Sequence, residues 1–408
     1  MKKHFVFILM IAAVHTGAAQ FRNDNVLYKT VYLQELCKTL QENPGYTILD
    51  VRSKGEYEDT SSSATLNLGH IKGAMNININ ELPVRWKEIS GMKDKPVFVY
   101  CTHSQRSRRA SKLLADSGFT KIFNINSGLT GVVLLDEAQR ECVRQMMETK
   151  NLYQLLSPAD VCNKLQKNAR GTFILDVRKD SAFRHISLNP KFNAYGHLKN
   201  AVNIPLADLE DKLNVVPKDK EIIVTDIFGD EAAKAGKLLR EKGFEKVWVL
   251  MEGMDRLLYS DENNISCKSS VYVSPVKFKV MSSAEYGRYS KTAGKYLLLD
   301  LRTSEEFNNK FRDAFRNVGY LKNAVNIPAA DIEARISEIE SFKNGPVVLY
   351  AFSGAPEVYK TAELLTAKGF KQVNVLAGGI FNIRWTAANT KGMSHLHDLV
   401  TGVPKENY

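Results

Sequence analysis

A cysteine stands where an apolar run meets a polar, arginine-rich segment. The run VFVYC (97–101) predicts a buried strand, and THSQR follows Cys101 directly. A strand-to-helix loop presents backbone N–H groups and the positive helix end, which together bind anions and favour a thiolate. Arg106 adds a positive charge five residues after the cysteine. We predict that Cys101 and Arg106 are catalytic and that the remaining loop residues bind substrate: Thr102, His103, Ser104, Gln105 and Ser107.

The sequence pattern that surrounds this loop occurs three times in the chain. The residues LDVR or LDLR carry Asp50, Asp176 and Asp300, which are 126 and 124 residues apart. After each Asp comes a second block that is similar in all three copies, and after the second block comes a third, apolar block. A period of this length is a whole domain rather than a solenoid repeat. The blocks are YTILDVR (46–52), TFILDVR (172–178) and YLLLDLR (296–302), then LGHIKGAMNI (68–77), YGHLKNAVNIP (195–205) and VGYLKNAVNIP (318–328), then VFVYC (97–101), IIVTD (222–226) and VVLYA (347–351).

Within each copy, short apolar runs alternate with helical patterns. In the first copy TILDV, AMNIN, PVFVYC and KIFNIN predict strands, and SRRASKLLADSG predicts a helix that stops at Gly118. Strands joined by helical crossovers form an open parallel α/β sheet, whose reactive groups lie beyond the carboxyl ends of the strands. The expected segments are a signal peptide (1–19), domain 1 (25–135), a helical linker (136–150), domain 2 (151–260), domain 3 (271–388) and a C-terminal tail (389–408).

The order LDVR, GHIKGAMNI, then strand–Cys–loop–Arg–helix resembles the rhodanese family, here as three tandem domains. The resemblance implies, for each domain, a parallel five-stranded sheet flanked by helices. It also implies thiosulfate sulfurtransferase activity through a Cys101 persulfide, with a small anionic sulfur donor and a thiol or cyanide acceptor. The family's active loop has the form Cys-x-x-Gly-x-Arg, but this chain has Ser104 in place of the glycine. If that position needs a positive φ, the serine is strained by about 1 kcal/mol or more.

The two other copies lack the nucleophile. The second loop, DIFGDE, has Asp226 at the cysteine position, and the third, AFSGAPE, has Ala351 there. Neither can form a persulfide, although both keep the glycine, at Gly229 and Gly354. We expect domains 2 and 3 to be structural or to present a surface to a protein partner.

The Asp50/Arg52 pair recurs in the copies without cysteine, as Asp176/Arg178 and Asp300/Arg302. We therefore expect a structural pair, in which the arginines bond to Glu56 and its equivalents, Asp180 and Glu306. A substrate-shaping role for Arg52 stays open as the alternative. His70 recurs as His197 and then as Tyr320, which favours a structural hydrogen bond over a catalytic base.

Two other functions compete with sulfur transfer. In the first, the chain is a non-catalytic scaffold of three rhodanese-like units and Cys101 is vestigial. In the second, it is a phosphatase or an arsenate reductase. Those enzymes use a Cys-x5-Arg loop, but the sixth residue after Cys101 is Ser107 rather than an arginine. A thiol–disulfide function is weaker still, because the chain has no Cys-x-x-Cys pair.

Composition and the N-terminal sequence limit the partners and the cellular location that we expect for the protein. The net charge is +11, spread along 408 residues without a basic block that includes aromatics, so we expect no nucleic-acid partner. The start MKKHFVFILMIAAVHTGAAQ reads as a secretory signal peptide, cut after Ala19, and its apolar run is too short to span a bilayer. We predict an extracytoplasmic protein without a membrane span. We expect no cofactor or metal, since His395 and His397 lie in a tail that we expect to be solvated.

Five cysteines are an odd number for an exported protein, so at least one lacks a partner within the chain. Cys37 and Cys162 lie in helix-like apolar settings and are interpreted as buried thiols. Cys142 and Cys267 lie in the predicted linkers, where they could pair with each other. Cys101 differs from these four because its surroundings are polar and basic.

Overall fold

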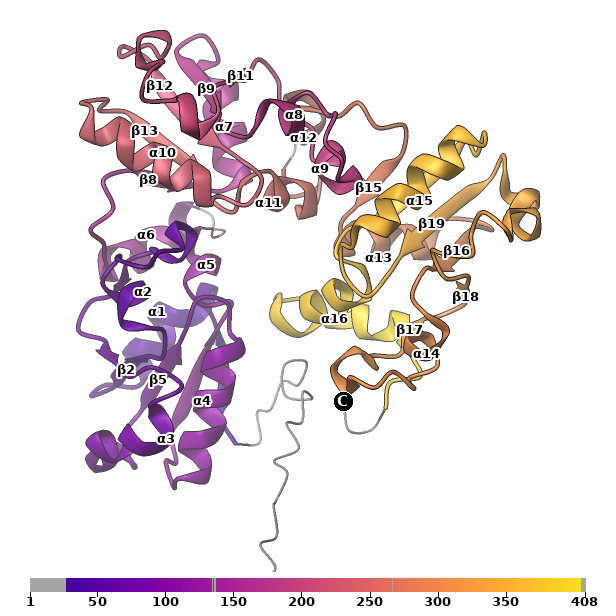
Figure 1. Cartoon of the computed structure of the whole chain (residues 1–408). Helices are drawn as coiled ribbons and strands as arrows, with labels where there is room; N and C mark the ends of the chain where they lie inside the picture. Colours follow the sequence, from indigo (N-terminus) through magenta and orange to yellow (C-terminus); the bar gives the residue numbers. More distant parts are fainter. Residues whose placement is uncertain (1–26, 134, 136, 266, 405–408) are drawn as a thin grey trace, which may run out of the picture.

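The computed structural model describes residues 27–133, 135, 137–265 and 267–404, and Figure 1 shows three α/β modules along this part of the chain. Each module has a parallel five-stranded sheet with the same strand order, as the repeat predicts. The order is β1-β6-β5-β2-β4 in module 1, β8-β13-β12-β9-β11 in module 2 and β15-β20-β19-β16-β18 in module 3. The three strands that run TILD, TFILD and LLLD in sequence therefore occupy equivalent places. The predicted signal peptide lies outside the described residues.

The strands of the three sheets have the following bounds: β1 (Lys29–Tyr32), β2 (Thr47–Asp50), β4 (Met75–Asn76), β5 (Val97–Tyr100) and β6 (Ile122–Asn126); β8 (Gln154–Leu156), β9 (Thr172–Asp176), β11 (Val202–Asn203), β12 (Glu221–Thr225) and β13 (Val247–Leu250); β15 (Lys279–Met281), β16 (Leu297–Asp300), β18 (Val325–Asn326), β19 (Pro346–Tyr350) and β20 (Gln372–Leu376). The α-helices are α1 (Leu33–Glu42), α2 (Lys54–Tyr57), α3 (Leu82–Arg85), α4 (Gln105–Asp116), α5 (Gly128–Val133) and α6 (Glu137–Met146); α7 (Pro158–Asn168), α8 (Asp180–Phe183), α9 (Pro190–Ala194), α10 (Asp230–Glu241), α11 (Gly253–Tyr259) and α12 (Lys268–Val271); α13 (Ser283–Thr292), α14 (Ser304–Phe307), α15 (Pro356–Ala367) and α16 (Gly379–Asn389).

The strand β5, which leads to Cys101, is buried on both faces, and this explains its unbroken apolar sequence. Phe98 and Tyr100 pack with Leu36 of α1 on one face of the sheet. Val97, Val99 and Cys101 pack with Ala110 and Leu114 of α4 on the other. This alternation follows from the two-residue period of a strand. It places Cys101 at the carboxyl end of the sheet, on the face that α4 covers.

The segment after each sheet folds back onto its own module. Short antiparallel pairs join β3 (His70–Ile71) to β7 (Met147–Glu148), β10 (His197–Leu198) to β14 (Tyr272–Val273) and β17 (Tyr320–Leu321) to β21 (Val400–Thr401). The expected helix within 136–150 is α6, but it belongs to module 1 rather than separating two domains. The tail is solvated only in part: His395 and His397 are exposed as expected, but Leu396 in the 3₁₀ helix η8 (Ser394–Leu399) is fully buried and β21 completes a pair.

Disulfides fix two of these returning segments. Cys37 of α1 pairs with Cys142 of α6, and Cys162 of α7 pairs with Cys267, each pair 105 residues apart. The interpretation of Cys37 and Cys162 as thiols is therefore wrong, and so is the suggested pairing of Cys142 with Cys267. In module 3 the equivalent of Cys37 and Cys162 is Gly287. A side chain there would meet Leu396 at 2.5 Å, so an apolar contact replaces the crosslink.

We expect the Cys37→Ser/Cys142→Ser variant to unfold module 1 more easily than the wild type. The disulfide closes a loop of more than a hundred residues. Its removal should lower the free energy of unfolding by about 2–4 kcal/mol. Hydrogen exchange of the α1 and α6 amides in denaturant measures this loss. Cys101→Ser is the matched control, since it changes a cysteine and leaves both disulfides in place. Equal exchange in the two variants would show that the crosslink does not stabilise the module.

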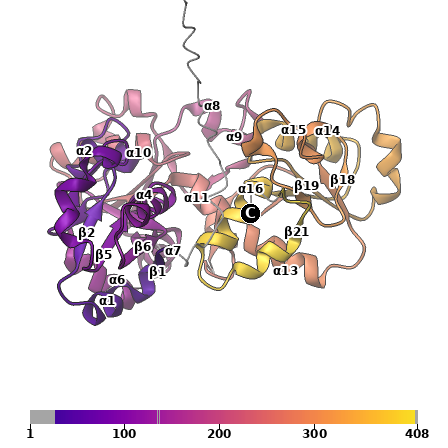
Figure 2. The same cartoon turned by 90° about the horizontal axis from the view of Figure 1, so that it is seen from below.

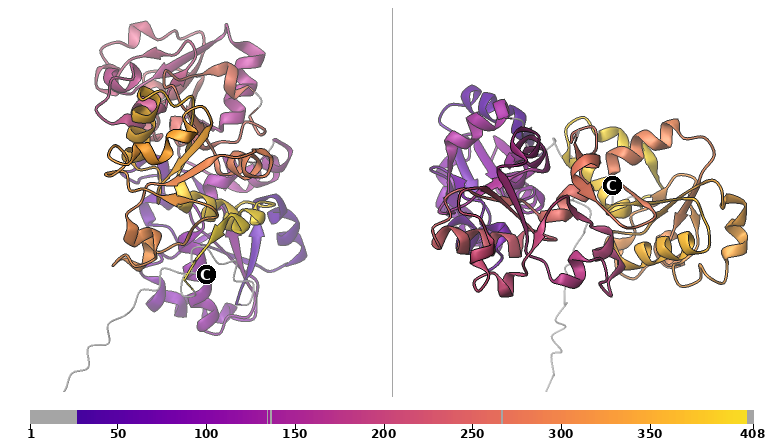
Figure 3. Two further views of the ribbon diagram at one scale, coloured as in Figure 1. Left: turned by 90° about the vertical axis from the view of Figure 1, so that its right-hand side faces the viewer. Right: turned by 90° about the horizontal axis from the view of Figure 1, so that it is seen from above.

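The three modules are not arranged in a line. Figure 1 shows module 2 between the other two, with α16 of module 3 pointing back toward module 1, and the turned views of Figure 2 and Figure 3 show module 3 beside both neighbours. Module 1 meets module 2 where the Ala64 N–H donates to Asp230 at 2.6 Å. It meets module 3 where Arg108 donates to the Ala388 carbonyl at 3.1 Å. No helix among the described residues is long and apolar enough to cross a membrane.

Candidate active site

Cys101 directly follows β5, and its loop leads into α4. Its side chain is 1% exposed, and the Ser104 N–H donates to Sγ at 3.2 Å. The Ser107 hydroxyl oxygen lies 3.6 Å from Sγ. The structure therefore brings the predicted nucleophile together with two of the predicted loop residues. The Ser104 N–H is thus a backbone donor to the sulfur, whereas the Ser107 hydroxyl accepts from the thiol.

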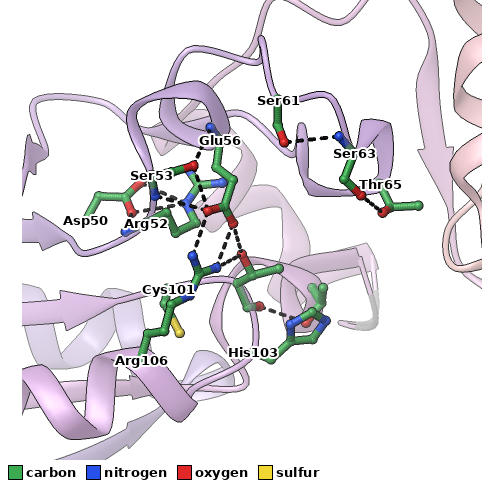
Figure 4. Close-up of polar contacts among 12 residues, drawn as sticks. Asp50, Arg52, Ser53, Glu56, Ser61, Ser63, Thr65, Cys101, His103 and Arg106 are labelled. Atoms are coloured by element: carbon green, nitrogen blue, oxygen red, sulfur yellow. Dashed lines mark hydrogen bonds and ion pairs between the residues drawn. The ribbon is translucent and has the colours of Figure 1, made fainter. Parts of the chain in front are cut away.

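Arg106 lies beside this loop, but its guanidinium is already engaged. Its two terminal nitrogens donate to the two carboxylate oxygens of Glu56, each at 2.6 Å, and one of them also donates to Thr102 Oγ1 at 2.8 Å. Figure 4 shows Arg106 pointing toward Glu56. Burial alone would raise the pKa of Glu56, but the hydrogen bonds from Arg106 and Ser53 outweigh burial and lower it to about 2. Arg106 is thus a positioned cation whose charge is shared with a buried carboxylate.

The expected pairing of Arg52 with Glu56 is wrong. Arg52 instead donates to Asp50, at 2.7 Å from its Nη2, and to the Gly69 carbonyl at 2.7 Å. Its side chain is fully buried, and Arg178 and Arg302 repeat these bonds in the modules without cysteine. The arrangement is structural, so we assign no substrate-shaping role to Arg52.

Glu56 is the site residue that sequence reasoning assigned to the wrong partner. It closes a capping box with Ser53 at the start of α2, and a box of this form is visible in the sequence as Ser-x-x-Glu. The same box recurs at Thr303 and Glu306 in module 3, where Arg316 replaces Arg106 as the partner. The box therefore places a buried carboxylate near the loop; its arginine partner comes from the loop in module 1 and from the 3₁₀ segment η6 (Ala314–Arg316) in module 3.

The other predicted loop residues divide into buried and exposed groups. Thr102 and Ser107 are buried, and Ser107 Oγ donates to the Ser104 carbonyl at 3.0 Å. Gln105 is exposed at the start of α4. His103 is also exposed, and its Nε2 lies 3.1 Å from Glu252 Oε1 of module 2. The loop thus turns Gln105 and His103 outward and buries Thr102 and Ser107, of which Ser107 lies beside the sulfur and Thr102 beside Arg106.

Ser104 adopts the left-handed backbone conformation that favours glycine. Its φ is 105°, and the equivalent Gly229 of module 2 has a φ of 92°. The expected strain is confirmed, because a serine in this region is disfavoured relative to glycine. Gly354 of module 3 does not have a positive φ; its loop contains one residue more before the helix.

The equivalent loop of module 2 binds a carboxylate with its backbone N–H groups. The Asp226 carboxylate takes the place of the cysteine and accepts hydrogen bonds from the backbone N–H groups of Gly229, of Glu231 at 2.8 Å and of Ala232 at 3.2 Å. The equivalent amides in module 1 belong to Ser104, Arg106 and Ser107. The loop therefore holds a negative charge with backbone donors alone. In module 2 that place is filled by the chain's own carboxylate.

Asp226 gives a pH-dependence that can be tested. Burial raises the pKa of Asp226 from 3.8 to about 6, against the backbone hydrogen bonds that lower it. Since the folded state then binds the proton more tightly, the free energy of unfolding falls as the pH rises from about 4 to about 6. The loss is roughly 3 kcal/mol. We expect Asp226→Asn to lack this fall, as measured by hydrogen exchange of the β12 amides across that range. Parallel pH profiles for wild type and variant would contradict the expectation.

A cavity of about 180 Å³ lies between modules 1 and 2, next to the exposed side of the Cys101 loop. It is lined by Thr65, Leu66, His103, Phe228, Glu252 and Asp255. His103 is the link between the loop and this cavity. Burial would raise the pKa of Glu252, but Arg256 and His103 outweigh it and lower the pKa to about 2, so the wall carries a negative charge beside His103. No cluster of three or more metal-ligating side chains occurs in the part of the chain that the structure describes.

Comparison with known proteins assigns the fold to a family. The sequence profile of the rhodanese-like domain matches residues 33–134, 157–258 and 284–385. The uncharacterized protein YqhL of Bacillus subtilis is 40% identical over 104 residues, which are 24% of this chain and 74% of YqhL. A tRNA uridine(34) hydroxylase of Cytophaga hutchinsonii is 28% identical over 95 residues, 22% of this chain and 28% of the hydroxylase. Among solved structures, a thiosulfate sulfurtransferase from Pseudomonas aeruginosa is 18% identical, with coverage of 91% of this chain and 68% of that protein and a TM-score of 0.24.

Proposed function

The chain belongs to the rhodanese family through three tandem rhodanese-like domains, and from this premise we propose that it is a sulfurtransferase with one active centre, at Cys101. The observation that carries the proposal is the contrast between equivalent loops. Module 2 fills its backbone cradle with the Asp226 carboxylate, module 3 has Ala351, and module 1 has a thiol in the same place. Modules 2 and 3 lack the nucleophile that sulfur transfer needs.

The first half-reaction takes sulfur from the donor. The Cys101 thiolate attacks the outer sulfur of thiosulfate or a similar sulfane donor and forms a new sulfur–sulfur bond. The donor's own sulfur–sulfur bond breaks, and its electron pair leaves on sulfite. The persulfide anion on Cys101 lies among the amides of Ser104, Arg106 and Ser107, which occupy the places of the amides that hold Asp226. Arg106, fixed by Glu56 and Thr102, supplies a positive charge toward the incoming dianion.

The second half-reaction restores the enzyme. A thiolate or cyanide attacks the outer sulfur of the persulfide, and the sulfur–sulfur bond breaks with its electron pair returning to Cys101. The acceptor leaves as a persulfide or as thiocyanate, and no outside oxidant or reductant is consumed. The cavity beside His103 offers a route for the acceptor, because it borders the exposed side of the loop.

We propose an extracytoplasmic location for the protein. Two disulfides support it, since such bonds persist in oxidising compartments. They also leave Cys101 as the thiol without a partner in the chain.

A coupled assay tests the proposed function. We expect the purified chain, incubated with thiosulfate and cyanide, to release sulfite and thiocyanate in equal amounts. Release of neither product, with thiosulfate or with other small sulfane donors, would favour a non-catalytic scaffold instead.

A further inference from the structure

The carboxyl end of α16, in module 3, lies against the catalytic module. The Asn389 carbonyl accepts hydrogen bonds from Asn126 Nδ2 at 3.1 Å and from Ser127 Oγ at 3.2 Å. The Ala388 carbonyl accepts from Arg108 Nη2 at 3.1 Å. The last carbonyls of a helix lack partners within the helix and carry a partial negative charge. Three side chains of module 1 therefore cap a helix that begins more than 250 residues later in the chain.

These contacts continue to the catalytic sulfur. Asn126 Oδ1 accepts from the Ser104 hydroxyl at 2.9 Å, and the same hydroxyl accepts from the Ser127 N–H. The Ser104 N–H in turn donates to Cys101 Sγ at 3.2 Å. Ser104 and Asn126 are fully buried, so water does not compete for these bonds. Two side chains thus connect the sulfur to module 3.

The polar residues of this path occur together in module 1 and not at the equivalent places in the other modules. The equivalents of Ser104, Asn126 and Arg108 in module 2 are Gly229, Met251 and Ala233. In module 3 the equivalents of Ser104 and Asn126 are Gly354 and Ala377. A serine at a positive φ is disfavoured, but its hydroxyl is the group that joins the loop to Asn126. This accounts for the exchange of glycine for serine in the copy that keeps the cysteine.

We propose that the carboxyl end of α16 positions the catalytic loop through Asn126 and Ser104, so that module 3 serves the active centre of module 1. The inference rests on the proposed function for its kinetic consequences. Ser104, Asn126, Ser127 and Arg108 act on the sulfur through the loop amide and are positioning residues. Loosening this path moves the amide away from the sulfur, which slows the attack without removing donor-binding groups. Small displacements of this kind cost up to about 100-fold in rate.

Two variants test the two halves of the path. Ser104→Gly restores the residue of the other modules and removes the hydroxyl. Arg108→Ala/Ser127→Ala removes two of the bonds to module 3 but leaves Ser104 and Asn126 unchanged, and Ala is the residue that module 2 has at the first of these positions. Arg109→Ala is the matched control, because Arg109 is exposed on the same helix. Circular dichroism and intact disulfides establish that each variant is folded.

The readouts separate this inference from the proposed function. We expect both test variants to lower kcat about tenfold with less than a threefold change in KM for thiosulfate, and the control to match the wild type. We also expect slower alkylation of Cys101 by iodoacetamide, a reaction that needs no sulfur transfer. Wild-type turnover and alkylation in both test variants would overturn the positioning role of this path, since Ser104→Gly breaks its link to Asn126. Slower alkylation in the variants of a protein that transfers no sulfur would contradict the proposed function alone.

Discussion

Cys101→Ser is expected to abolish sulfur transfer while the protein stays folded. A serine hydroxyl cannot form a persulfide, and neither Asp226 nor Ala351 can replace the nucleophile. The rate should therefore fall by roughly four orders of magnitude or more, to the level of the solution reaction. The substitution removes one buried sulfur atom and keeps both disulfides, so the unfolding profile should change little.

The measurement for this variant is sulfite release with thiosulfate and cyanide, at matched protein concentration. The Cys37→Ser/Cys142→Ser variant is the matched comparison, because it also replaces cysteines but leaves the loop intact. Release by Cys101→Ser at the wild-type rate would contradict the assignment of the nucleophile.

Arg106→Met is expected to give the second-largest loss of kcat/KM for thiosulfate. Glu56→Gln is compared with it to separate the effect of the arginine's charge from that of the ion pair. Arg106 supplies the positive charge beside the loop, so its removal should lower kcat/KM for thiosulfate by about 100-fold. The variant also leaves the Glu56 carboxylate buried without its main partner, and this unpaired carboxylate repels an anionic donor.

Glu56→Gln instead keeps an acceptor for Arg106 and removes the negative charge. We expect this variant to bind thiosulfate more tightly than Arg106→Met and at least as tightly as the wild type.

Steady-state kinetics over a range of thiosulfate concentrations distinguishes these variants. Arg109→Ala, one turn along the same exposed helix face, controls for a general loss of positive charge. A loss in Arg109→Ala equal to that in Arg106→Met would show that the arginine acts by net charge alone. A Glu56→Gln variant as impaired as Arg106→Met would mean that the ion pair itself, rather than the arginine's charge, serves the reaction.

The repeat in the sequence was sufficient to predict four of the five strands of each sheet and the place of the cysteine. Strands such as VFVY are apolar throughout because both faces are covered, and the carboxyl end of a parallel strand is where a loop can present its amides. The edge strand β1 (Lys29–Tyr32) was not among the predicted strands, because only one of its four residues is fully buried.

The parts that sequence reasoning missed depend on contacts between distant segments. The 105-residue spacing of both disulfides was present in the sequence, but the segments with Cys142 and Cys267 were interpreted as linkers rather than as the last part of each module. Glu56 was assigned to Arg52 because both recur, whereas in all three modules the buried arginine bonds to the aspartate two residues before it. The reason for Ser104 lies in module 3, and no local pattern reports a contact with Asn389.

The central claim is that Cys101 alone carries sulfur between donor and acceptor. Intact-protein mass spectrometry after brief exposure to thiosulfate, followed by peptide mapping, tests it most directly. We expect a gain of one sulfur atom per chain, located on Cys101, lost on addition of cyanide and absent from Cys101→Ser. An unmodified Cys101 in a chain that still releases sulfite, or the same gain in Cys101→Ser, would contradict it.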